Sequence, residues 1–296
     1  MTGLVFEARQ TASDRLAAVK ILWPHLRESA AAIARFREEA ALAGRVAGQG
    51  ILPMIASGRS GGHEYYATAL ATGPTLAQFI DEAIGTRGEL FFRESALRFA
   101  RVGHTVEALH RAGIIHRKIK PSNLFMERDS FLLSDFELAI DLQRSVENPE
   151  RPEESFPGSG IRRPRVYSAP EEFVAGSWLS GRVDVYSLGL SLYELAVGVL
   201  PFPCCKDDEL ARLKMTRDPI APAQLNRDVP LGLQAVIQQA IASCPASRHP
   251  TAADLARDLE RFAERKRGDT RHHDTPGEDP SDDDGGDDSP DLARIA

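Results

Sequence analysis

The order of strand-like and helix-like segments constrains the fold of this chain more than any other feature. Before residue 75, short apolar runs typical of strands dominate, and one helical pattern interrupts them at about residues 29–46. After residue 75 the apolar spacing is mainly helical, and Gly113 ends a long helix expected at about residues 94–112. Residues 180–197 are apolar on nearly every face, which predicts a helix buried in the core. We therefore predict an α+β fold, with a small sheet-rich part followed by a large helical part.

The chain length agrees with two parts of unequal size. A chain of 296 residues suits one large bilobal domain or two ordinary domains. The remaining expected strands lie at residues 16–22, 51–55 and 65–70, with short strands over 114–133, and the remaining expected helices lie at 76–84, 207–215, 231–242 and 251–265. An irregular, charged loop is expected at residues 141–165.

The composition narrows the class of protein. Hydrophobic residues make up 42% and charged residues 27%, an ordinary globular balance. No apolar run reaches the roughly 18 residues that span a bilayer, so no membrane span is predicted. The first residues show no secretory signal, and the three cysteines, with Cys204 and Cys205 adjacent, form no disulfide or metal-binding pattern. We therefore expect a cytoplasmic protein.

The net charge of −7 is concentrated at one end. Residues 268–296 hold ten acidic residues against two arginines, a balance of −8, so residues 1–267 carry about +1. A nearly neutral folded part gives no electrostatic reason to expect nucleic acid or membrane binding. We expect residues 268–296 to be a disordered acidic tail, with contact to a basic partner as the alternative.

Residues 116–123 have the sequence His-Arg-Lys-Ile-Lys-Pro-Ser-Asn. This segment is similar to the catalytic loop His-Arg-Asp-x-Lys-x-x-Asn of protein kinases. Further motifs of that family occur in the same order: Ala17-Ala18-Val19-Lys20, Arg35-Phe36-x-x-Glu39-Ala40, Ser134-Asp135-Phe136-Glu137, Ala169-Pro170-Glu171, Asp184-Val185-Tyr186-Ser187-Leu188-Gly189 and Arg248. Over residues 1–265 the chain resembles the bacterial Hanks-type serine/threonine kinases. The resemblance implies a bilobal kinase fold, with an N-lobe at residues 1–72 and a C-lobe at residues 73–267. It also implies that Asp184 anchors the backbone of the catalytic loop and that Arg248 pairs with Glu171.

The resemblance also implies a nucleotide site between the lobes. In the family, the lysine that matches Lys20 holds the α- and β-phosphates of ATP. Its partner glutamate matches Glu39, with Glu38 as the neighbouring alternative. Thr68 would line the back of the adenine pocket, and Ala69 to Ala71 would offer backbone groups to the base.

The catalytic loop departs from the family at one position. Lys118 replaces the aspartate that accepts the proton of the substrate hydroxyl. A lysine is positively charged at neutral pH and has no lone pair to offer a proton. Lys120, Asn123 and Asp135 are retained, and Asn123 and Asp135 match the oxygen ligands of Mg²⁺. The resemblance therefore implies binding of ATP and Mg²⁺ by a chain that lacks the family's base.

Three further segments differ from the family. Arg163-Pro164-Arg165-Val166-Tyr167 replaces Gly-Thr-Pro-x-Tyr, whose threonine bonds the catalytic aspartate, and Glu137 replaces a glycine that permits backbone conformations glutamate resists. Gly3-x-Val5-Phe6-x-Ala8 resembles only the end of the glycine-rich phosphate loop, so the first strand and two glycines would lie before Met1. Either the start codon lies upstream, or the sheet lacks its first strand. We favour the first, because a sheet that lacks its first strand would expose unpaired backbone groups at its edge.

Three functions are compatible with these motifs. The leading hypothesis is a pseudokinase that binds ATP–Mg²⁺ and regulates a protein partner. The alternatives are a serine/threonine kinase of low turnover, acting on a protein substrate, and a rigid scaffold that binds no nucleotide. The activation segment offers Ser145, Ser155, Ser159 and Ser168 but no threonine for phosphorylation, and Arg117 is a candidate partner for a phosphoserine.

Overall fold

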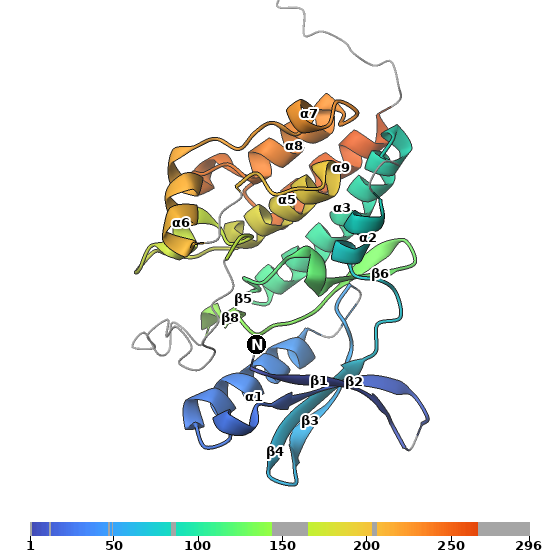
Figure 1. Ribbon diagram of the computed structural model, residues 1–296, viewed down its shortest axis with the longest axis vertical. Coiled ribbons are helices and arrows are strands. Elements are labelled where there is room, and N and C mark those ends of the chain that lie inside the picture. Colours follow the sequence, from blue (N-terminus) through green and yellow to red (C-terminus); the bar gives the residue numbers. More distant parts are fainter. Residues whose placement is uncertain are drawn as a thin grey trace, which may run out of the picture. The chain divides into compact units, whose positions relative to one another are not determined.

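The computed structural model describes residues 2–11, 13–46, 48, 50–83, 87–143, 165–202 and 206–265 (Figure 1). Contacts divide the chain into two compact units, Met1–Glu264 and Arg265–Ala296. All the helices and strands named here belong to the first unit, which is a bilobal α+β fold. In the part of the chain that is described, no helix is both long enough and apolar enough to cross a membrane.

A four-stranded antiparallel sheet forms most of the N-lobe. Its strand order is β1-β2-β4-β3, and the bounds are β1 Gly3–Arg9, β2 Leu16–Leu22, β3 Met54–Ser60 and β4 His63–Ala69. The prediction for residues 16–22 is confirmed, whereas the strand predicted at 51–55 is shifted along the chain. Ile51 makes only an isolated bridge, and the strand begins after Pro53, which has no N–H to donate to a ladder. The strand then runs to a two-glycine turn at Gly61 and Gly62, both with positive φ.

Helix α1 (Ala30–Arg45) covers one face of this sheet (Figure 1). Its first turn is capped by Ser29, whose hydroxyl accepts a hydrogen bond from the Ala32 N–H at 3.2 Å. Phe36 and Ala40 of α1 pack against Leu22 and Tyr66 of the sheet and form a small separate core. Glu39, the residue before Ala40 on α1, is also buried and contacts Lys20 of β2.

The C-lobe is helical and is built around a buried helix, α5. The longer helices are α3 Glu89–Arg111, α5 Arg182–Val197, α6 Asp207–Thr216, α8 Leu231–Ala240 and α9 Ala252–Glu264; the shorter ones are α2 Leu76–Glu82, α7 Pro222–Leu225, η2 Pro121–Asn123, η3 Pro170–Phe173 and η4 Pro245–Ser247. One further short helix, η1 Pro24–Leu26, belongs to the N-lobe and lies between β2 and α1. Helix α5 is buried on every face, as predicted. Helix α3 begins five residues before the predicted start because Phe91 and Phe92 extend its apolar face onto Phe79 of α2.

Two short antiparallel pairs position the segments between the lobes. Strand β5 (Ile114–Ile115) pairs with β8 (Ile140–Asp141), and β6 (Leu124–Glu127) pairs with β7 (Ser130–Leu133). These pairs bring residues 116–123 alongside residues 134–139. The loop expected at residues 141–165 lies, from residue 144 to 164, outside the described residues.

Candidate functional site

The backbone of the 116–123 loop is held by a buried carboxylate from α5. Asp184 is fully buried, and its two oxygens accept hydrogen bonds from the N–H groups of His116 and Arg117, each at 2.8 Å. His110 Nε2 donates a third hydrogen bond to the same carboxylate at 2.8 Å. The Arg117 backbone has a φ of 60°, a strained conformation for a residue with a side chain, and the Asp184 contacts hold it there. This confirms the anchoring role that the resemblance implies for Asp184.

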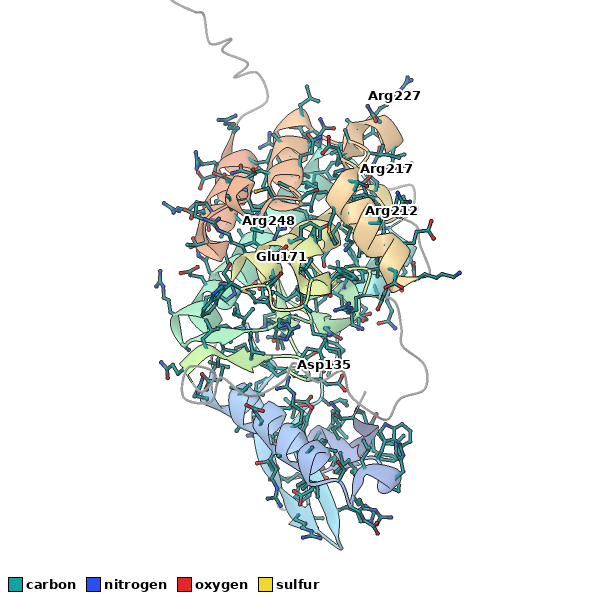
Figure 2. All side chains as sticks on the ribbon, turned by 90° about the vertical axis from the view of Figure 1, so that its left-hand side faces the viewer. Asp135, Glu171, Arg212, Arg217, Arg227 and Arg248 are labelled. Carbon is teal, nitrogen blue, oxygen red and sulfur yellow. The ribbon has the colours of Figure 1, made fainter. Side chains whose placement is uncertain are left out.

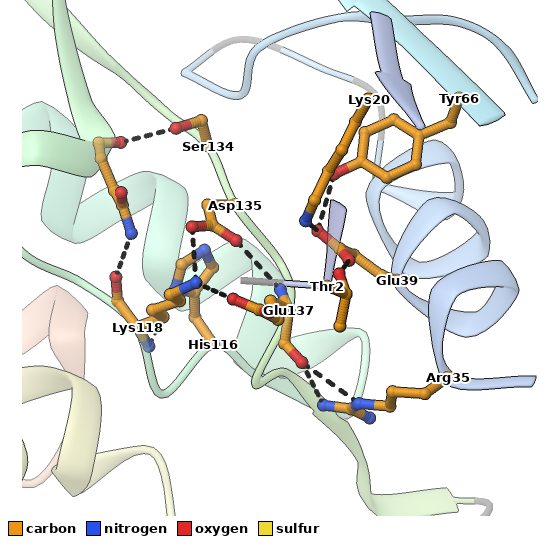
Figure 3. A network of polar contacts seen from close by, with 11 residues as sticks. Thr2, Lys20, Arg35, Glu39, Tyr66, His116, Lys118, Ser134, Asp135 and Glu137 are labelled. Atoms are coloured by element: carbon orange, nitrogen blue, oxygen red, sulfur yellow. Dashed lines mark hydrogen bonds and ion pairs between the residues drawn. The ribbon is translucent and has the colours of Figure 1, made fainter. Parts of the chain in front are cut away.

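Lys20 and Glu39 form a buried ion pair between the sheet and α1. The Lys20 ammonium lies 2.7 Å from Glu39 Oε1, and the Tyr66 hydroxyl donates to the same oxygen at 2.6 Å (Figure 3). Glu38, the alternative partner, instead contacts Arg35 at 3.4 Å. Burial raises the pKa of Glu39 and, together with the nearby Glu39 charge, raises that of Tyr66. Lys20 is therefore held in one position at the inner face of the sheet.

Lys118 points at two carboxylates of the 134–139 segment (Figure 3). Its ammonium lies 2.7 Å from Asp135 Oδ2 and also contacts Glu137 Oε2. Lys118 and Glu137 are both departures from the family's motifs, and the structure brings them into direct contact. The two substitutions therefore compensate each other in charge.

The ionisation of this cluster follows from its charges. Burial alone would raise the pKa of Asp135, but the charges of Lys118 and Lys20 outweigh it and hold that pKa at about 2. Burial likewise works against ionisation of Lys118 and Glu137. The charges of Asp135 and Glu137 outweigh it and raise the pKa of Lys118, and the charge of Lys118 lowers the pKa of Glu137. Lys118 is thus a permanent cation near neutral pH and cannot accept a proton.

Arg35 ties α1 to the same segment. Its guanidinium donates to the Glu137 carbonyl at 2.7 and 3.1 Å and to the Ala139 carbonyl at 2.9 Å. Asp135 has a φ of 67°, which is costly for a residue with a side chain. The contacts of Arg35 and Lys118 on either side of it supply the restraint that this conformation needs. The sequence places Arg35 in a motif but does not predict this role, because backbone carbonyls of any residue can be its partners.

The other predicted site residues surround this cluster. Asn123 is buried, and its amide donates to the Lys118 carbonyl at 2.8 Å, while Lys120 lies half-buried on the same loop. Thr68 is half-buried on β4, opposite Ala18 of β2. Ala69 ends β4 and Ala71 follows it, both half-buried.

The donor set at Asp135 does not suit the Mg²⁺ that the family implies. One oxygen of Asp135 accepts from the Lys118 ammonium, and the other accepts from the Glu137 N–H at 3.4 Å. A divalent cation at either oxygen would face the positive charge of Lys118. Among the described residues, no group of three or more His, Cys, Asp or Glu is arranged to hold a metal ion.

Arg117 already has a carboxylate partner. Its Nε lies 3.2 Å from Glu172 Oε2, and both side chains are largely buried. A phosphoserine would have to displace Glu172 to pair with Arg117. Three of the candidate serines, Ser145, Ser155 and Ser159, lie outside the described residues, and the fourth, Ser168, is buried.

A buried lysine supports the segment that precedes η3. Lys214 of α6 is 1% exposed and donates to the carbonyls of Val166 at 2.8 Å and Ser168 at 2.6 Å. Burial lowers the pKa of Lys214 to about 7. Sequence analysis missed this residue because a lysine on a helix is usually exposed. The other charged groups that act on it are Glu172, Arg248, Arg165 and Asp207.

We expect Lys214 to make the stability of the protein pH-dependent. Its pKa is about 7 in the folded chain and has an ordinary value of 10.5, so unfolding takes up a proton between these values and the free energy of unfolding rises with pH. The measurement is urea unfolding of wild type and Lys214→Met from pH 6.5 to 9. The free energy of unfolding of wild type should increase relative to that of Lys214→Met as the pH rises. If the free energies of unfolding of the two proteins varied in parallel with pH, Lys214 would not be the source of the pH dependence.

Comparisons with known proteins agree with the fold described above. A family model described as "Protein kinase domain" matches residues 1–268. The chain is 28% identical to the probable serine/threonine-protein kinase CPE1738 of Clostridium perfringens, over 88% of this chain and 36% of that protein. It is 29% identical to the serine/threonine-protein kinase PknB of Mycolicibacterium smegmatis, over 87% of this chain and 40% of that protein. The chain therefore spans less than half the length of these relatives. The crystal structure of the Mycobacterium tuberculosis PknI kinase domain superposes with a TM-score of 0.63 at 21% identity, covering 88% of this chain and 91% of that one, and supports the fold.

Proposed function

Because this chain belongs to the protein kinase domain family, we propose that it is a pseudokinase, which binds ATP and regulates a protein partner without transferring phosphate. The observation that carries the proposal is Lys118, a permanent cation bound to Asp135 and Glu137 at the position of the family's base. The two carboxylates that it contacts have lowered pKa values and are poor proton acceptors.

Retained nucleotide binding is supported by the Lys20–Glu39 pair. Both side chains are buried, in contact at 2.7 Å, and supported by Tyr66, which is the arrangement that the family uses to orient phosphates. A nucleotide that contacts both lobes would favour one arrangement of them, and a partner that recognises that arrangement would sense the nucleotide. Regulation of a partner would then need no phosphate transfer.

The same buried pair supports a second candidate, a serine/threonine kinase of low turnover. Phosphoryl transfer depends mainly on positioning and charge stabilisation, and the Asp184 contacts hold the catalytic loop as a kinase needs it. In that case Lys118 would stabilise the transferring phosphoryl group in place of a base.

Transfer of radiolabelled phosphate from ATP to the protein itself and to a generic basic protein distinguishes the two. We expect wild type, with Mg²⁺ or Mn²⁺, to show no transfer above an Asp135→Ala control, because Lys118 stands at the position of the family's base and accepts no proton. In parallel, ATP should raise the melting temperature of wild type but not of Lys20→Met. Transfer by wild type that disappears in Asp135→Ala would replace the pseudokinase with the kinase.

A further inference from the structure

We infer that the Lys118 ammonium takes the place of the divalent cation in this site, so that the chain binds a nucleoside triphosphate free of metal. The inference rests on the proposed nucleotide-binding function and goes beyond it, since the family's bound nucleotide is a magnesium complex. It assigns to Lys118 a role in neutralising phosphate charge.

The position of Lys118 supports this role. A Mg²⁺ ligand oxygen lies about 2.0–2.1 Å from the ion, and a metal so close to Asp135 Oδ2 would also be close to an ammonium 2.7 Å from the same oxygen. The repulsion is strong because the cluster is shielded from water: the Lys118 side chain is 15% exposed and the Glu137 side chain 6%. Metal and Lys118 therefore exclude each other at Asp135.

Lys118 cannot leave this position cheaply. Without its charge, Asp135 and Glu137 would be two neighbouring, largely buried carboxylates with like charge. The segment that carries them is also fixed, because Arg35 bonds the Glu137 carbonyl and the Glu137 N–H faces Asp135. Expelling Lys118 to admit a metal would therefore break both of its ion pairs and leave Glu137 without that cation.

The charge of the whole cluster leads to the same conclusion. Its members carry three positive and three negative charges, a net charge of zero: Lys20, Lys118, Lys120, Glu39, Asp135 and Glu137. The family's pattern, with aspartate for Lys118 and glycine for Glu137, has a net charge of −1 before a metal binds. The net charge of the present cluster is thus one unit more positive, which favours binding of a polyphosphate without a metal. Lys20 and Lys118 are each held by a carboxylate and need no metal to approach the phosphates.

Calorimetric titration of the full chain with ATP, in EDTA and in excess MgCl₂, tests the inference. We expect wild type to bind in EDTA, and Mg²⁺ to weaken the apparent affinity because it removes free ATP from solution. Lys118→Met should lose about tenfold in EDTA, whereas Lys118→Arg, which keeps the charge, should retain binding. Lys206→Met, the same change at an exposed lysine of the C-lobe, should bind as wild type does. Circular dichroism checks that each variant is folded.

The outcomes separate this inference from the function on which it rests. Binding by wild type only when Mg²⁺ is present would overturn the inference and leave an ATP-binding pseudokinase. Binding in EDTA that is unaffected in a folded Lys118→Met would overturn the role of Lys118. Absence of binding under both conditions would overturn the inference and the nucleotide-binding part of the proposed function together.

Discussion

Replacing Arg248 with alanine is expected to lower the free energy of unfolding by about 3–5 kcal/mol, because it leaves a largely buried carboxylate without its partner. Arg248 is completely buried and forms two parallel hydrogen bonds with Glu171, at 2.7 and 2.9 Å. It also donates to the carbonyls of Ala242, Arg182 and Ser243, which would lose these bonds. Figure 2 shows Arg248 and Glu171 next to each other within the C-lobe. Urea unfolding followed by circular dichroism measures the loss.

Two variants make this expectation specific. Arg212→Ala removes the same side chain from the exposed side of α6, and its effect should stay within about 0.5 kcal/mol (Figure 2). Glu171→Gln keeps acceptor and shape but removes the negative charge, so it should cost less than Arg248→Ala. An Arg248→Ala variant within about 1 kcal/mol of wild type would mean that this pair contributes no more than an exposed one.

The contacts that hold the kinase fold could be predicted from sequence, because each belongs to a motif with fixed order and spacing. The pairing of Arg248 with Glu171 and the anchoring of the loop by Asp184 were both expected, and both are confirmed. The buried helix α5 was expected because its sequence is apolar on all faces. The predicted starts of α3 and β3 were less accurate. The aromatic packing of Phe91 and the missing N–H of Pro53 determine where these elements begin, and neither belongs to the periodic pattern of apolar residues.

The contact between Lys118 and Glu137 could not be predicted from the sequence. Each residue departs from the family at its own motif, 19 positions apart, and no periodicity links the two. Taken separately, each is an isolated departure from a family motif. The structure shows instead one local ion pair, made when the two strand pairs bring the motifs together. The effect of each substitution depends on the other, because the two side chains come into contact only in the folded protein.

Because the two substitutions are coupled, we expect phosphate transfer to require reversal of both. Lys118→Asp alone restores a base but puts a third negative charge beside Asp135 and Glu137, and it removes the cation that contacts both of them. Glu137→Gly alone leaves Lys118 on Asp135 and supplies no base. The single variants should therefore stay near the background of the assay, and Lys118→Asp should be less stable than wild type.

The double variant Lys118→Asp/Glu137→Gly is expected to transfer phosphate at least about 10²-fold faster than wild type, the lower end of what a positioned base contributes. Its activity should require Mg²⁺, because Asp135 no longer faces an ammonium and is free to hold the metal. Adding Asp135→Ala to the double variant should abolish the transfer, which separates it from a contaminating kinase. A folded double variant that stays at background would place the defect elsewhere, in the segment around Arg165 that also departs from the family. Transfer by Lys118→Asp alone at the rate of the double variant would show that Glu137 and Lys118 are not coupled, and that the missing base is the whole cause of inactivity.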